Sequence, residues 1–156
     1  MPVKGTLTLP GDKSISHRSV MLASLSDQRS KISNLSNGKD VKSTILCLKN
    51  CGIDIDYSSK SHFIRGGRFK QPIVDLDCGN SGTTARLLSG ILVGQNFSSI
   101  LDGDNSLRRR PMKRIEEPLR TMKADISTNN GCLPIEIKPS SLQGGEFNLN
   151  LVNHPD

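Results

Sequence analysis

The chain has 156 residues, enough for one domain or parts of two and for a buried core. Hydrophobic residues make up 34% of it, aromatic residues make up 3%, and tryptophan is absent, so the core must consist mainly of Leu, Ile and Val. The net charge of +6 favours anionic partners such as nucleic acid, membrane surfaces or phosphorylated metabolites. The densest basic run, Arg108-Arg109-Arg110, has no aromatic neighbour on which a base could stack, which argues against a nucleic-acid binder.

The cysteines argue for a reducing compartment and against a metal site. Cys47, Cys51, Cys78 and Cys132 show neither paired CxxC spacing nor a companion histidine pattern, so zinc is not expected. No signal-peptide pattern precedes the first predicted strand, and no apolar run reaches the length of a membrane span. We therefore expect a cytoplasmic protein with free thiols that does not bind membranes.

Strand and helix patterns alternate in the first half of the chain. Apolar residues at every second position predict a strand over residues 3–10, which Pro10-Gly11 ends. Apolar and small residues at helical spacing then predict a helix over Ser14–Ser26. The elements predicted next are a strand over Lys31–Leu35, a helix over Val41–Asn50, and a hairpin of Asp54–Tyr57 with His62–Arg65.

The second half repeats this order. The predicted elements are a strand over Ile73–Cys78, a loop over Gly79–Thr84, a helix over Ala85–Val93, a strand over Ser99–Leu101, a helix over Pro111–Met122, and a hairpin of Ile126–Thr128 with Leu133–Ile137. Pro118 predicts a distortion within its helix. Two blocks of strand, helix and hairpin indicate a modular architecture. An alternating run over residues 147–151 begins another strand, and without a closing element we expect an incomplete repeat.

The start of the first helix carries groups that suit an anion. Lys13, Ser14 and Arg18 combine an ammonium, a hydroxyl and a guanidinium at a helix N-terminus, where free N–H groups already favour phosphate or carboxylate. A helix capped by serine, with Lys13 and Arg18 facing water, is an equally good interpretation of these residue types. His17 is an acid/base candidate by type, but a histidine on a helix surface is more often passive.

Two further corners of the same kind follow. In the loop over Gly79–Thr84, which contains Asn80, the glycines let the N–H groups of Ser81, Gly82 and Thr83 approach a ligand. A tight turn capped by Thr83 explains the same residues. Pro111 suits the first helical position and places Arg110 at the helix cap, where it can hold a carboxylate or phosphate, although a solvated basic face remains the alternative.

Each corner follows a strand and opens a helix. If the strands are neighbours, all three corners converge at one end of the sheets. The sequence then predicts a pocket for a small molecule that carries two or more acidic groups.

The three motifs resemble those of a known enzyme family. Leu9 to Arg18, the Gly79-Asn80-Ser81-Gly82-Thr83 loop with Arg86 after it, and Arg110-Pro111-Met112 are similar to the signature segments of the 3-phosphoshikimate 1-carboxyvinyltransferases, or EPSP synthases. The resemblance implies an α/β (α+β) fold of repeated βαβαββ units, the enolpyruvyl transferase or inverse α/β barrel fold, incomplete in this chain. It also implies a first segment over residues 1–18 that crosses into a second domain, and a partial repeat domain over residues 19–156.

The resemblance implies an enolpyruvyl transfer from phosphoenolpyruvate to the 5-hydroxyl of shikimate 3-phosphate, in the synthesis of chorismate and aromatic amino acids. Lys13 matches a lysine that contacts both substrates, Ser14 and Arg18 match shikimate 3-phosphate contacts, and Gly82 and Arg110 match phosphoenolpyruvate contacts. Asn80 lies in the same loop and is a weaker match. No cofactor or metal is implied, and the full-length enzyme is expected to be a monomer. Glyphosate is the family's inhibitor and occupies the phosphoenolpyruvate site. Gly82 has no β-carbon to obstruct that site, whereas Leu87 stands where many glyphosate-sensitive members have proline.

Length is the main departure from the family. The resemblance places the acid and base groups in parts that these residues do not include, so we expect no catalytic residue here and no activity from the 156 residues alone. The alternatives are a short, non-catalytic anion-binding protein, a small basic nucleic-acid binder, and the related UDP-N-acetylglucosamine enolpyruvyl transferase. The last has a different first motif and a cysteine loop that we do not find here.

Overall fold

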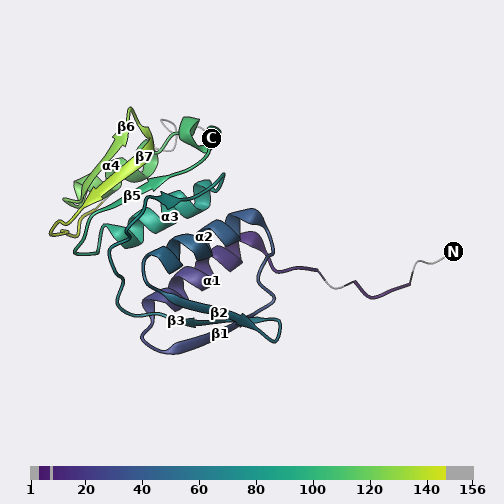
Figure 1. The fold of residues 1–156 in the computed structure, drawn as a ribbon. Helices are drawn as coiled ribbons and strands as arrows, with labels where there is room; N and C mark the ends of the chain where they lie inside the picture. Colours follow the sequence, from purple (N-terminus) through teal and green to yellow (C-terminus); the bar gives the residue numbers. More distant parts are fainter. Residues whose placement is uncertain (1–3, 8, 147–156) are drawn as a thin grey trace.

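The structure is a computed structural model and describes residues 4–7 and 9–146. Three helices lie side by side between two sheets: α1 (Lys13–Leu25), α2 (Lys39–Asn50) and α3 (Gly82–Leu92). Figure 1 shows the three-stranded sheet on one side of these helices and the four-stranded sheet, with α4 (Lys113–Thr121), on the other. The mixed α/β architecture agrees with the fold class that the sequence predicts.

The first sheet belongs to the first repeat. It contains β1 (Arg29–Ser33), β2 (Asp54–Ser58) and β3 (Ser61–Arg65), in the antiparallel order β1-β3-β2. The hairpin of β2 and β3 is confirmed, and β1 lies two residues earlier than predicted.

The second sheet has the same plan with one more strand. It contains β4 (Leu76–Asp77), β5 (Ser99–Asp102), β6 (Asp125–Asn129) and β7 (Cys132–Lys138), in the order β4-β5-β7-β6. The order β5-β7-β6 reproduces β1-β3-β2, because in both repeats the last strand inserts between the other two. The predicted repeat of strand, helix and hairpin is therefore confirmed. β4 pairs parallel with β5.

Both repeats share one core. Val20, Leu48 and Ile64 of the first repeat and Leu88 and Ile135 of the second belong to a single cluster of buried apolar side chains. Fully burying an aliphatic side chain of this size stabilises a fold by about 1.5–3 kcal/mol. The two units therefore stabilise each other, as expected of a modular fold.

Two predicted strands are wrong or shortened. Residues 4–7 and 9–10 form no strand and are exposed, since no neighbouring strand pairs with them; Val3 and Thr8 lie outside the described residues. Figure 1 shows this segment extending away from the helices. The strand predicted over Ile73–Cys78 is reduced to Leu76–Asp77. The side chain of Ile73 is 98% exposed, so it is not part of the core of the described residues although it is apolar. The strand predicted over residues 147–151 lies outside the described residues.

Helix α4 begins later than predicted. Its first residue is Lys113 and its N-cap is Met112, so Pro111 precedes the helix. Leu107–Arg109 form a short 3₁₀ helix, η1, and Arg110 is the C-cap of η1 rather than the cap of α4. Pro118 lies inside α4, as expected.

Candidate functional site

The start of α1 differs from a serine-capped helix. Asp12 is the N-cap, and its Oδ1 accepts a hydrogen bond of 2.7 Å from the backbone N–H of Ile15. Ser14 therefore lies in the first turn and is exposed. Lys13 Nζ lies 3.1 Å from Oδ2 of Asp40 at the start of α2, and Arg18 Nε donates to the carbonyl of Ser14 over 3.2 Å. The three predicted cationic and hydroxyl groups are thus close together and accessible.

Close packing fixes this turn against the segment before α2. A β-carbon on Gly11 would lie 1.9 Å from the carbonyl oxygen of Asn34, so only glycine allows this approach. Ser16 Oγ donates to the carbonyl of Asp12 over 2.6 Å and accepts the N–H of Ser36 over 2.9 Å. The position of the α1 N-terminus is therefore set by backbone contacts and does not depend on the Lys13–Asp40 ion pair.

The loop before α3 ends in a serine cap. Ser81 Oγ accepts the N–H of Thr84 over 3.1 Å, so Ser81 and not Thr83 is the N-cap. The N–H of Ser81 donates to the carbonyl of Cys78 over 2.9 Å, so the prediction that it faces a ligand is wrong. Within residues 4–7 and 9–146, no acceptor is found for the N–H groups of Gly82 and Thr83. These two groups remain able to bind an anion.

Two guanidinium groups flank Gly82. A β-carbon built on Gly82 would lie 3.1 Å from Nη1 of Arg86 and 3.5 Å from Nη1 of Arg110. Arg86 Nη2 donates to the carbonyl of Pro111 over 3.1 Å, and Nη2 of Arg110 donates to Oδ1 of Asn80. The space beside Gly82 therefore faces two positive charges and a helix N-terminus, which is the arrangement that a phosphate or carboxylate requires.

Asn80 positions Arg110 through a second contact. Its Nδ2 donates to both carboxylate oxygens of Asp104, over 2.9 and 2.7 Å, while its Oδ1 accepts from Arg110. The hydrogen bonds from Asn80 and from the N–H groups of Leu107 and Ser106 hold the pKa of Asp104 below its usual range. Asn80 is therefore a residue that orients Arg110, which the sequence motif alone did not indicate.

The three corners lie close together, but not for the predicted reason, because residues 4–7 and 9–10 form no strand before the first corner and Arg110 ends η1 instead of opening α4. Asp40 binds Lys13 through its side chain, and its carbonyl accepts a hydrogen bond of 3.3 Å from Oγ1 of Thr84 on α3. The N-terminal turns of α1, α2 and α3 therefore meet, and Asn80 joins the α3 turn to Arg110. Their partial positive charges add to those of the cationic side chains.

His17 was expected on the surface of its helix, but it lies in the interior. It is fully buried, and its Nδ1 lies 2.7 Å from Oγ1 of Thr44, which lies 2.7 Å from Oγ1 of Thr84. Burial lowers the pKa of His17; Asp40 opposes this shift and Lys13 adds to it. Sequence analysis missed Thr44, which belongs to no motif that predicts binding, and included Thr84 only as the last residue of the Gly79–Thr84 loop.

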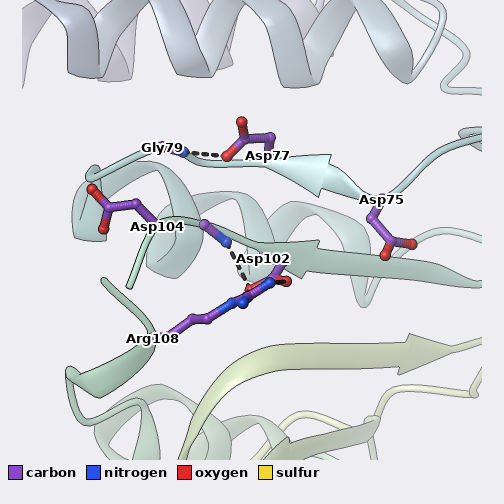
Figure 2. Close-up of a pocket in the computed structure, with 7 residues that line it drawn as sticks. Asp75, Asp77, Gly79, Asp102, Asp104 and Arg108 are labelled. Atoms are coloured by element: carbon purple, nitrogen blue, oxygen red, sulfur yellow. Dashed lines mark hydrogen bonds and ion pairs between the residues drawn. The ribbon is translucent and has the colours of Figure 1, made fainter. Parts of the chain in front are cut away.

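An acidic cavity of about 340 Å³ lies beside Gly79 (Figure 2). Its lining includes Asp75, Asp77 and Asp104, and in Figure 2 Asp77 accepts the N–H of Gly79 over 2.7 Å. Asp102 forms a two-pronged ion pair with Arg108, which holds the pKa of Asp102 below its usual range. Four carboxylates against one guanidinium repel anions, so this cavity does not suit a phosphate or carboxylate.

The described residues contain neither a candidate metal site nor a candidate membrane-spanning helix. No group of three His, Cys, Asp or Glu side chains suitable for a metal ion occurs in the described part of the chain. None of the helices described here combines the length and apolar character needed to cross a membrane.

Comparison with known proteins gives the family. The sequence model of "EPSP synthase (3-phosphoshikimate 1-carboxyvinyltransferase)" matches residues 1–153. The chain belongs to the EPSP synthase family. It is 44% identical over 156 residues to the 3-phosphoshikimate 1-carboxyvinyltransferase of Herpetosiphon aurantiacus, and 48% identical over 153 residues to that of Vesicomyosocius okutanii. These alignments cover 97% and 96% of this chain.

A solved EPSP synthase has the same fold. The structure from Acinetobacter baumannii superposes with a TM-score of 0.89 at 38% identity and covers 94% of this chain. The chain spans about a third of these EPSP synthases: 36% of the Herpetosiphon protein, 35% of the Vesicomyosocius protein and 35% of the Acinetobacter chain. The EPSP synthase resemblance seen in the motifs is therefore confirmed, and the UDP-N-acetylglucosamine enolpyruvyl transferase alternative is not favoured.

Proposed function

We propose that this chain forms the part of a 3-phosphoshikimate 1-carboxyvinyltransferase that binds the anionic groups of shikimate 3-phosphate and phosphoenolpyruvate. The observation that carries the proposal is the Gly82 corner, where Arg86 and Arg110 flank Gly82 and the N–H groups of Gly82 and Thr83 have no acceptor within residues 4–7 and 9–146. Membership of the EPSP synthase family supports the choice of these two substrates.

The two anion sites have separate roles in this proposal. Lys13, Ser14 and Arg18 at the start of α1 contact shikimate 3-phosphate, and Lys13 also contacts phosphoenolpyruvate. Gly82 and Arg110, with Asn80 as the orienting residue, hold phosphoenolpyruvate. The arrangement suits enolpyruvyl transfer, because several cations and helix N-termini are needed to bring two anionic substrates together.

The proposal extends to the whole protein and its setting. The proton transfers of the reaction require groups outside these residues, so the 156-residue chain binds substrate without turnover. Residues 1–18 form the crossing segment to a second domain, and residues 19–156 form the partial repeat domain. The full-length protein acts as a cytoplasmic monomer without a cofactor, and glyphosate competes at the Gly82 corner.

Calorimetric titration of the chain with shikimate 3-phosphate tests the proposal. Binding should be present in the unmodified chain and lost in Lys13→Ala and Arg18→Ala, whereas Lys60→Ala, in the turn between β2 and β3, should leave it unchanged. A folded chain that binds no shikimate 3-phosphate, or variants that bind as well as the unmodified chain, would refute it. Turnover by the 156 residues alone would refute the assignment of acid and base groups to other parts.

A further inference from the structure

A chain of buried hydrogen bonds joins the N-terminal halves of α1, α2 and α3. It runs from His17 through Thr44 and Thr84 to Ser81, with 2.7 Å between each successive pair of atoms. The four side chains are fully buried or nearly so. Buried polar groups are stabilised only when they are paired, so this chain fixes the relative positions of three helices.

The hydroxyl protons determine which groups donate. Thr84 has one hydroxyl proton, and its donor contacts lead to Oγ of Ser81 and to the carbonyl of Asp40. In the contact between the two threonines, Thr44 must then be the donor, which uses its own single proton. Thr44 can therefore only accept from His17, so Nδ1 of His17 carries the proton.

With the proton on Nδ1, a neutral His17 ring has a bare Nε2. Nε2 is buried and has no hydrogen-bond partner within residues 4–7 and 9–146, so it adds no competing contact. Burial favours the neutral ring, and the charged groups acting on it are Asp40 and Lys13, which oppose each other. The ring therefore acts as a fixed donor at one end of the chain.

The two ends of this chain lie in the two anion sites. His17 is four residues after Lys13 in α1, while Ser81 caps α3 directly before Gly82. We propose that His17, Thr44 and Thr84 are positioning residues that hold the Gly82 corner in register with the α1 N-terminus, so that binding at one site favours binding at the other. This inference rests on the proposed function for the identity of the two ligands.

The test measures coupling between the two ligands in the 156-residue chain. The dissociation constant of shikimate 3-phosphate is measured by calorimetry with and without saturating phosphoenolpyruvate. We expect about a five-fold or greater tightening in the unmodified chain, in the usual range for coupled sites. Thr44→Val and Thr84→Val remove a hydroxyl at constant shape and should reduce this factor towards one.

Three controls separate positioning from stability. Thr44→Ser keeps the hydroxyl and should retain the coupling. Ser89→Ala on α3 and Ser24→Ala on α1 each remove a buried hydroxyl that bonds only a carbonyl of its own helix, and both should leave the coupling unchanged. Urea unfolding of every variant then shows whether loss of coupling follows loss of stability. Equal coupling in Thr44→Val and the unmodified chain, or no coupling in the unmodified chain, would overturn the inference.

A spectroscopic measurement needs no ligand. Nitrogen NMR of the His17 ring should show a protonated Nδ1 and an unprotonated Nε2 at pH 7.5, and Thr44→Val should shift the Nδ1 resonance. A ring protonated at Nε2 would overturn the direction of the chain and with it the inference. If the His17 ring shows the expected tautomer but the chain does not bind shikimate 3-phosphate, the result would instead count against the proposed function.

Discussion

Gly82 lies beside the guanidinium of Arg110, and a β-carbon on the glycine would come within 3.5 Å of Nη1 of that arginine. The space that an anion needs between the guanidinium and the helix N-terminus exists because the residue has no side chain. This relationship makes Gly82 the position at which a single methyl group most directly tests the anion site.

Gly82→Ala should weaken phosphoenolpyruvate binding while the chain stays folded. The methyl group would meet the ends of flexible arginine side chains, which can move, but it would occupy the space of the ligand. Loss of one charge-assisted hydrogen bond raises the dissociation constant about ten-fold or more. The measurement is a calorimetric titration with phosphoenolpyruvate.

Gly90→Ala is the matched control. It lies in the same helix, and a β-carbon there would meet nothing within 4 Å. The substitution should stabilise α3 by about 0.5–1 kcal/mol and leave binding unchanged. Equal affinity of Gly82→Ala and Gly90→Ala would argue against an anion site beside Gly82.

The Asp102–Arg108 ion pair should make stability depend on acid pH. The pKa of Asp102 is lowered by its hydrogen bonds with Arg108, so this contribution is present above the unfolded value of about 4 and is lost as the pH falls through the lowered pKa. Asp102→Asn should cost about 1 kcal/mol at pH 7, a modest amount because Arg108 is half exposed, and less below pH 4. Urea unfolding at both pH values measures this. Asp54→Asn, at an exposed strand position, should show no such difference.

The repeat was predictable from the sequence because each element carries its own periodicity. The hairpins of β2 with β3 and of β6 with β7 alternate apolar and polar residues around polar turns, and α2 ends at Cys51-Gly52 as expected. Periodicity could not show whether the alternating residues 3–10 have a pairing partner. Of these, residues 4–7 and 9–10 are exposed because no strand of the described structure pairs with them.

The exact geometry of the site was not predictable, because tertiary contacts determine it. The N–H of Met112 donates to the carbonyl of Gly131 over 2.7 Å, which delays the start of α4 and leaves Arg110 at the end of η1. His17, Thr44 and Thr84 are separated by 27 and 40 residues, so no local pattern connects them. The motifs therefore contain the candidate ligand contacts and Asn80, but not the buried His17–Thr44–Thr84 contacts behind them.

Native thiol reactivity should be confined to Cys132. Burial, with a smaller effect of Cys47, raises the pKa of Cys51 to about 12, and a hydrogen bond with Cys47 and burial raise the pKa of Cys78. Cys47, Cys51 and Cys78 are fully buried, whereas Cys132 at the start of β7 is partly exposed. Ellman's reagent at pH 8 should therefore label one thiol rapidly in the folded chain and all four in denaturant. Rapid labelling of a Cys132→Ser variant would contradict this burial pattern.

His17 should make the chain less stable as the pH falls below 6.5. Because burial lowers its pKa in the folded state, the unfolded chain binds a proton first, and stability is lost as the pH falls from about 6.5 towards the lowered pKa. His62 has a pKa that burial and Lys49 also lower, so it contributes to the same slope. Urea unfolding between pH 7.5 and 5 should therefore show that the free energy of unfolding depends less steeply on pH in His17→Gln and in His62→Gln, and hardly at all in the double variant.

Only His17→Gln should also weaken the coupling between the two ligands, because His62 lies on β3, outside the buried hydrogen-bond chain. An unchanged slope in His17→Gln would show that the ring accepts a proton within the fold, contrary to the burial of Nε2 without a hydrogen-bond partner among the described residues.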